Sequence, residues 1–260
     1  MATDFFNQQF KDQAKKSIFF PLIRKARRME IATKKAEARW EDYKIYPSSL
    51  KSMGQCPKDF IASLAKPSTI EDILAIYKVK RGSAVHLELQ KDLLLSDKIA
   101  PMPNQEFMTD RIKEKLLKGW PEAPFHSMVT RHSGSADGVI LVKGRPTGVE
   151  IKTTSIDFDR WKNMSKPSDA HIFQVCDYMY HFKLDDYYDP PIDTFIIAYL
   201  NLLYPPGDQD AEKEFEVHFS DHEERYLSYI NEETRQLNAY IEGTVLECKH
   251  EFCHKHKEKK

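Results

Sequence analysis

The residues best suited to catalysis lie in two short apolar segments near the middle of the chain. Asp137 begins the first, and Glu150-Ile151-Lys152 lies in the second, after a turn. Because side chains alternate along a strand, Glu150 and Lys152 project from one face while Ile151 points into the core. A hairpin would bring Asp137 beside them. Two carboxylates can bind Mg²⁺ or Mn²⁺, and a nearby lysine can neutralise a phosphate. Together these groups are suited to hydrolysis of a phosphodiester bond.

A plainer interpretation of the same residues is an exposed ion pair. An isolated Glu-x-Lys is usually a solvated pair on a strand, and an aspartate often only caps a strand. The neighbours here favour buried strands, however: they are Val139, Ile140, Leu141, Val149 and Ile151. Charges next to a core are costly unless a metal or a partner compensates them. We therefore interpret the cluster as a metal site.

Three further polar side chains occur in predicted helices on either side of this segment. His86 follows Gly82 by four residues; the glycine allows another backbone to approach, and the imidazole can ligate a metal. Gln174 and Tyr178 are four residues apart and share one helix face, with His171 one turn earlier. An amide and a phenol there could hydrogen-bond phosphate or stack on a base. Taken singly, each of these residues is more often an ordinary core or surface residue than a metal ligand or a DNA contact.

In this order, the whole set resembles the RecB-like branch of the PD-(D/E)XK nuclease superfamily, over about residues 48 to 203. That branch includes nuclease domains of bacterial recombination helicases, CRISPR-associated adaptation exonucleases and viral recombination exonucleases. The resemblance implies a restriction-endonuclease-like α/β core, with a mixed β-sheet flanked by helices.

The resemblance also implies a role for each matching residue. His86, Asp137 and Glu150 would ligate the metal together with the carbonyl of Ile151. Lys152 would orient the attacking water or stabilise the transition state. Gln174 and Tyr178 would contact DNA. The implied catalytic set is His86, Asp137, Glu150 and Lys152, acting with Mg²⁺ or Mn²⁺.

Hydrophobic periodicity predicts the elements that would position these residues. Helices are expected over residues 4–40, 48–66, 69–95, 107–118, 169–183 and 221–241, and strands over 125–130, 137–143, 147–153, 193–201 and 214–219. We expect three parts: a basic helical arm over 1–46, a nuclease domain over 47–247 and a basic Cys/His tail over 248–260.

Composition narrows the class of protein. With 260 residues, 41% hydrophobic and 30% charged, the chain is ordinary for a globular protein, which excludes disordered and collagen-like classes. Its apolar runs fall well short of the roughly 18 residues of a membrane span, and the N-terminus lacks a signal-peptide core, so we expect a soluble cytoplasmic protein. Basic ends flank an acidic middle, which suits a polyanionic partner such as DNA, although lysines on exposed helices would look the same.

The cysteines are candidates for a second metal site. Cys56 precedes Pro57, and the tail carries Cys248 and Cys253 with interspersed histidines. In the CRISPR-associated and helicase-linked relatives, one early Cys joins three late ones around an iron–sulfur cluster. Only two late Cys are present here, so the fourth ligand would be a His or Cys176. Three alternatives stay open: an iron–sulfur cluster, tetrahedral Zn²⁺, or a tail with free thiols.

The function predicted from these features is a divalent-metal-dependent deoxyribonuclease, with exonuclease action on ends or single strands favoured, in recombination, repair or genome processing. The sequence contains no G-x-x-x-x-G-K-[ST] phosphate loop, so unwinding would require a helicase or recombinase partner. The alternative is a nucleic-acid-binding or assembly protein on a catalytically decayed nuclease scaffold. An RNA substrate is a third possibility.

Overall fold

The computed structural model describes residues 45, 48, 54–64, 73–95, 99–100, 122–127, 129–205, 208–244 and 246–253. The chain divides into two compact units, residues 1–42 with 66–79 and residues 43–65 with 80–260. The elements and contacts below belong to the second unit, except that helix α4 (Ile73–Leu94) begins in the first. The helices predicted over 4–40 and 107–118, and nearly all of the predicted arm, lie outside the described residues.

A four-stranded mixed sheet forms the centre of the second unit. Its strands are β3 (Gly138–Val142), β4 (Arg145–Thr154), β5 (Thr194–Asn201) and β6 (Glu212–His218), in the order β3-β4-β5-β6. β4 and β5 are parallel, whereas the other two pairs are antiparallel. The predicted α/β class and mixed sheet are confirmed.

The β3–β4 hairpin leaves one edge of β4 exposed to other elements. Lys143 and Gly144 have positive φ angles of 52° and 80° and form the two-residue turn. The pairing runs from this turn to Gly138 opposite Val149, where β3 begins. β4 continues to Thr154. We call the β3-facing side of residues 150–154 the open edge of β4, because β3 is the described strand on that side and it stops at Val149.

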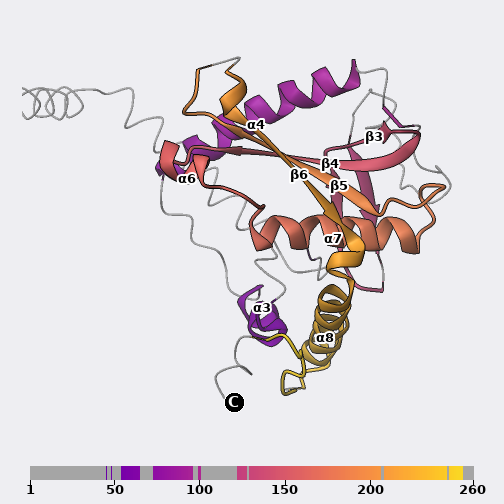
Figure 1. Ribbon diagram of the computed structural model, residues 1–260. Coiled ribbons are helices and arrows are strands. Elements are labelled where there is room, and N and C mark those ends of the chain that lie inside the picture. The colour runs from indigo at the N-terminus through magenta and orange to yellow at the C-terminus, as the bar shows by residue number, and fades with distance from the viewer. Residues whose placement is uncertain are drawn as a thin grey trace, which may run out of the picture. The chain divides into compact units, whose positions relative to one another are not determined.

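Helices lie on the two faces of this sheet (Figure 1). α7 (Asp169–Leu184) covers one face, and the part of α4 from Lys80 onward covers the other. Gly148 shows how closely the sheet is packed on the α7 face: a Cβ there would lie 2.2 Å from the Phe195 ring. The parallel register places Gly148 opposite Phe195, so only a residue without a side chain fits.

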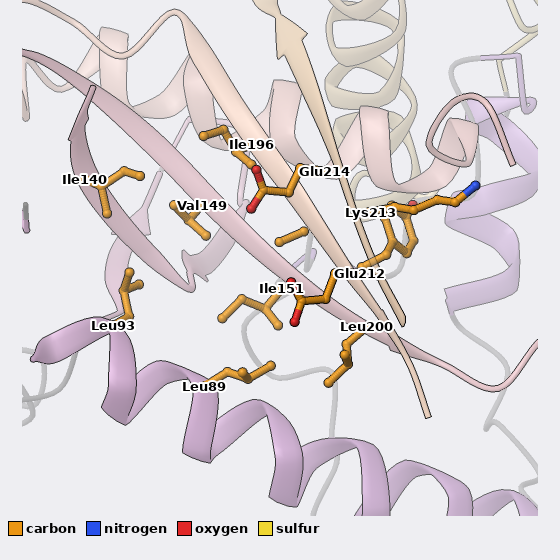
Figure 2. Close-up of a pocket in the computed structure, with 12 residues that line it drawn as sticks. Leu89, Leu93, Ile140, Val149, Ile151, Ile196, Leu200, Glu212, Lys213 and Glu214 are labelled. Carbon is orange, nitrogen blue, oxygen red and sulfur yellow. The ribbon is translucent and has the colours of Figure 1, made fainter. Parts of the chain in front are cut away.

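The α4 face of the sheet contains an apolar pocket of about 320 Å³ (Figure 2). Leu89 and Leu93 of α4 lie across from Val149 and Ile151 of β4. Because side chains alternate, Glu150 and Lys152 point to the opposite face. The pocket therefore belongs to the hydrophobic packing of α4 on the sheet.

The remaining elements extend this core. They are α3 (Pro57–Leu64), β1 (Ala123–His126), β2 (Ser133–Ala136), α6 (Phe158–Lys162) and α8 (Glu223–Ile241), with short 3-10 turns at Gln209–Ala211 and Phe219–Asp221. β1 and β2 form a separate antiparallel pair. α8 packs on α3 and α7. None of the described helices is both long enough and apolar enough to span a membrane.

Several predicted boundaries are wrong. The helix predicted over 48–66 corresponds to α3, which begins only at Pro57, after a turn at Gly54 and a bend at Gln55. The strand predicted over 125–130 is β1, which ends at His126. Two elements were not predicted: β2, whose residues Ser-Gly-Ser-Ala have little strand preference, and the short helix α6.

Candidate active site

Asp137 occupies the open edge of β4. Its backbone N–H donates to the Val149 carbonyl at 3.1 Å, which continues the β3–β4 ladder by one bond. Its carboxylate Oδ2 then accepts the Ile151 N–H at 2.6 Å, in place of a backbone carbonyl of β3. The N–H and C=O of one strand residue point the same way, so the Ile151 carbonyl faces this edge too. The predicted meeting of Asp137 with the Glu150-Ile151-Lys152 segment is therefore found.

Helix α4 contributes two side chains to the same carboxylate. His86 Nε2 lies 2.9 Å from Asp137 Oδ1, and Gln90 Nε2 donates to that oxygen at 3.3 Å. The two residues are four apart and share one helix face. The hydrogen bond to Asp137 raises the pKa of His86 above its usual value, against the effect of burial. Gln90 was not predicted, although its spacing from His86 was the available signal.

Gly82 permits this approach of α4 to β4. A Cβ at Gly82 would lie 2.6 Å from Thr153 Oγ1. The predicted reason for the glycine was close approach of another backbone, but the atom that it accommodates is the hydroxyl of a side chain. The glycine therefore places α4 over the end of β4, one helical turn before His86.

Glu150 and Lys152 form the second half of the site. Lys152 Nζ donates to Glu150 Oε1 at 2.6 Å and to Gln174 Oε1 at 2.8 Å. Glu150 is 3% exposed, and among the described residues nothing donates to its Oε2. Burial, followed by the charge of Asp137, raises the pKa of Glu150 to about 7. A buried carboxylate oxygen that lacks a donor, next to a second carboxylate, is suited to a cation.

Helix α7 holds this pair from behind. Ser168 caps the helix by accepting the His171 N–H. The Gln174 amide donates to Glu150 Oε1 at 2.9 Å and to the Tyr178 hydroxyl at 2.7 Å. Gln174 and Tyr178 are both buried. In this arrangement they fix the Glu150 and Lys152 side chains, and their contact with DNA stays a prediction.

The donor set fits a hard divalent cation, with two carboxylates, one backbone carbonyl and one imidazole. In the described part of the chain, two groups of three side chains have ligand atoms within 4.8 Å of one another, namely Cys56 with Cys248 and Cys253, and His132 with Asp177 and His181. The three predicted ligands His86, Asp137 and Glu150 are more widely spread than those groups. Holding one ion with all three would require their side chains to move closer together.

The cysteine group joins two distant parts of the chain. Cys56 precedes α3, whereas Cys248 and Cys253 follow α8, which packs on α3. Burial raises the pKa of Cys56, and it raises the pKa of Cys248 to about 12. Cys176, one of the two kinds of fourth ligand considered above, is buried within α7 and does not belong to the group. Of the tail histidines, His254 and His256 lie outside the described residues.

The histidine group is a buried charge network that sequence analysis missed. His132 Nδ1 lies 2.8 Å from Asp177 Oδ1, and its Nε2 lies 3.0 Å from Glu233 Oε2. Despite its burial, the charges of Asp177 and Glu233 raise the pKa of His132 to about 10. His181 places Nδ1 2.8 Å from the Asp177 carbonyl and Nε2 2.8 Å from the Thr130 hydroxyl. Asp177 Oδ2 is also buried and lacks a hydrogen-bond partner among the described residues, so the atoms of this group are placed where they could hold a metal as well.

Comparisons with known proteins found exonucleases among the solved structures. No protein-family model matches the sequence, and no curated protein is detectably similar to it. The chain is similar in structure to an alkaline exonuclease from Laribacter hongkongensis, with a TM-score of 0.44, 12% identity, and coverage of 77% of this chain and 90% of that one. The Laribacter enzyme has also been crystallised with dAMP.

Two further solved structures were found. A phage-related exonuclease from Haemophilus somnus 129PT gives a TM-score of 0.36 at 13% identity, over 77% of this chain and 96% of that one. The protein SSO0001 gives 0.34 at 19% identity, over 84% and 86%. Exonucleases thus stand among the similar structures. At these identities, catalysis has to be argued from the side chains of this chain.

Proposed function

We propose that this protein is a divalent-metal-dependent deoxyribonuclease whose active site lies at the open edge of β4. The observation that carries the proposal is the buried Glu150 Oε2, which lacks a donor among the described residues and lies close enough to Asp137 for the two charges to interact. Here Lys152 and Gln174 both bind Oε1, which leaves Oε2 for a cation.

His86, Asp137, Glu150 and the Ile151 carbonyl would hold Mg²⁺ or Mn²⁺. When bound, such an ion lowers the pKa of its water and stabilises charge that develops on a phosphate. Hydrogen bonds within the chain hold Asp137 near this position, and ion binding would draw the three side chains closer together. The Ile151 N–H holds Asp137, and Gln90 donates to the same carboxylate as His86.

Lys152 would act on the phosphate itself. An ammonium group has three N–H donors, and two of them bind Glu150 and Gln174. The third can donate to a water or to a phosphate oxygen, and the side chain is 20% exposed, so a substrate can reach it. The Tyr178 hydroxyl fixes Gln174, which in turn binds Lys152. Helix α7 therefore determines where the Lys152 ammonium group lies.

Cleavage assays test the proposal. We expect the wild type to degrade DNA only when Mg²⁺ or Mn²⁺ is added, and Glu150→Gln to lose activity by on the order of a thousandfold. Glu216→Gln is the matched control, because Glu216 is an exposed glutamate on β6. End-labelled single-stranded, blunt and nicked substrates would show whether action is exonucleolytic, as the sequence resemblance favours. Binding of DNA by the wild type without any cleavage would instead support the decayed-scaffold alternative.

We also propose that Cys56, Cys248 and Cys253 bind a metal, either an iron–sulfur cluster or Zn²⁺. Three thiols within 4.8 Å of one another, drawn from both ends of the described chain, are suited to a closed metal site. An iron–sulfur cluster predicts visible absorbance in anaerobically purified protein, whereas Zn²⁺ predicts a colourless protein that contains zinc. Cys253→Ser should lose the metal, and Cys176→Ala should retain it. Wild-type protein free of iron and zinc would contradict the proposal.

A further inference from the structure

His171 stands beside the proposed catalytic lysine. It lies in the first turn of α7, one turn before Gln174, which binds Lys152. Tyr199 of β5 is the register partner of Lys152 on β4, so these two side chains project from the same face of the sheet. His171 Nδ1 lies 2.5 Å from the Tyr199 hydroxyl. The Lys152 charge acts on the His171 ring as well.

The Tyr199 hydroxyl determines which ring nitrogen of His171 carries the proton. The Ser168 N–H points to the phenol oxygen at 3.4 Å, so that oxygen accepts from the helix cap. Its single hydrogen can then be donated to His171 Nδ1, and burial raises the pKa of Tyr199, which keeps the phenol protonated. A neutral imidazole that accepts at Nδ1 carries its hydrogen on Nε2. In this tautomer, His171 presents an N–H donor at Nε2.

The His171 ring is also uncharged near neutral pH. Burial, followed by the nearby Lys152 charge, lowers the pKa of His171 to about 4. The side chain is only partly buried. A neutral donor beside a cationic one is a pair that can bind two oxygens of a phosphodiester without doubling the positive charge.

We propose that His171 is a further substrate-binding residue, whose Nε2–H donates to a nonbridging phosphate oxygen of the nucleic acid next to Lys152. Tyr199 is a positioning residue, since it acts by holding the imidazole and its tautomer. This inference rests on the proposed nuclease function, because it assumes that Lys152 faces a phosphodiester. It adds a residue to the predicted site and assigns that residue a specific atom.

Substitutions that differ in one donor test the assignment. The amide of glutamine can replace an Nε2–H, whereas alanine cannot. With saturating Mn²⁺, we expect His171→Ala to lower kcat/KM on a short single-stranded oligonucleotide by about ten- to a hundredfold, and His171→Gln to restore it to within about threefold of the wild type. Tyr199→Phe should fall between these two. His218→Ala, at an exposed histidine of β6, is the control. A purely structural role would not be rescued by glutamine.

Two measurements without turnover separate this inference from the proposed function. Nitrogen-15 NMR should show His171 as the neutral Nε2–H tautomer in the wild type and a mixture of tautomers in Tyr199→Phe. Fluorescence anisotropy with the same oligonucleotide, without added metal, should show weaker binding by His171→Ala than by His171→Gln. If the wild type binds but does not cleave, the nuclease proposal fails while this contact stands. Equal binding and equal cleavage by His171→Ala and the wild type would overturn the inference.

Discussion

Two clusters of carboxylates and histidines contact neighbouring residues of α7, and they differ in their exposure to solvent. In the buried network, His132 lies between Asp177 and Glu233, and all three side chains are at most 1% exposed. In the candidate active site, Lys152 is 20% and His86 is 27% exposed. The first cluster is sealed from solvent, whereas the second can be reached by a substrate.

The protonation of the two clusters differs as well. The pKa of His132 is raised to about 10, and the His132 charge opposes burial and holds the pKa of Asp177 below its usual value, so that ion pair persists at neutral pH. The pKa of Glu150 is raised to about 7, so its negative charge is incompletely compensated by its neighbours. The comparison teaches that similar residue types form a solvent-excluded network around His132 and a solvent-accessible cluster around Lys152.

The largest effect should come from removing Lys152, the partly exposed cation of the candidate active site. Lys152→Ala should lower cleavage by on the order of a thousandfold, because the phosphate loses its charged donor. The variant should still fold, because Glu150 can take up a proton once its cation is removed. End-labelled cleavage and urea denaturation measure the two. Full activity in this variant would contradict the proposed site, and Asp137→Ala should behave like Lys152→Ala in cleavage.

In the buried network around His132, a substitution should lower the stability of the fold. His132→Ala leaves two buried carboxylates without their cation, and we expect it to cost about 3–5 kcal/mol of unfolding free energy. Urea denaturation followed by circular dichroism gives this value. If the variant is as stable as the wild type, the ion pair does not hold the fold together, and the contrast between the clusters is lost.

The pH dependence of stability sharpens the same contrast. The folded-state pKa of His132 is raised from 6.5 to about 10, so the protein binds this proton more tightly when folded. The stabilisation is complete below about pH 6.5 and is lost as pH rises through 10, with a slope of at most about 1.4 kcal/mol per pH unit. Urea denaturation between these limits should show the decline in the wild type and a flatter profile in His132→Gln. Equal slopes would exclude His132 as the group responsible.

The smallest effect concerns Tyr178, which lies next to Asp177 on α7 but faces the active site. Tyr178→Phe removes the hydroxyl that accepts from Gln174, and about 1 kcal/mol of positioning should be lost. We expect kcat to fall by about fivefold, with little change in KM. If Tyr178 contacts DNA directly, as the sequence resemblance implies, KM would rise instead.

Much of the core was predictable because its signals are local. The apolar segments over 137–143, 147–153 and 193–201 correspond to β3, β4 and β5, and the helical period predicted α7 and α8. The meeting of Asp137 with Ile151 followed from one hairpin, in which the partners are 14 residues apart. A short turn fixes the register of such a hairpin, so sequence reasoning can find it.

The missed features depend on contacts that sequence spacing does not reveal. His132 lies 45 residues from Asp177 and 101 residues from Glu233, and it follows a turn with no pattern of its own. The His171–Tyr199 contact joins α7 to β5 across 28 residues. Such pairs are created by packing a helix on a sheet, so they become visible only when the elements are placed in space.

The most direct test of the central claim is Mn²⁺ binding, measured by electron paramagnetic resonance on the full-length protein. The wild type should take up Mn²⁺, while Glu150→Gln and Asp137→Asn should lose that binding and Glu216→Gln should keep it. Mn²⁺ binding by Glu150→Gln as tight as that of the wild type would contradict a metal site at the open edge of β4.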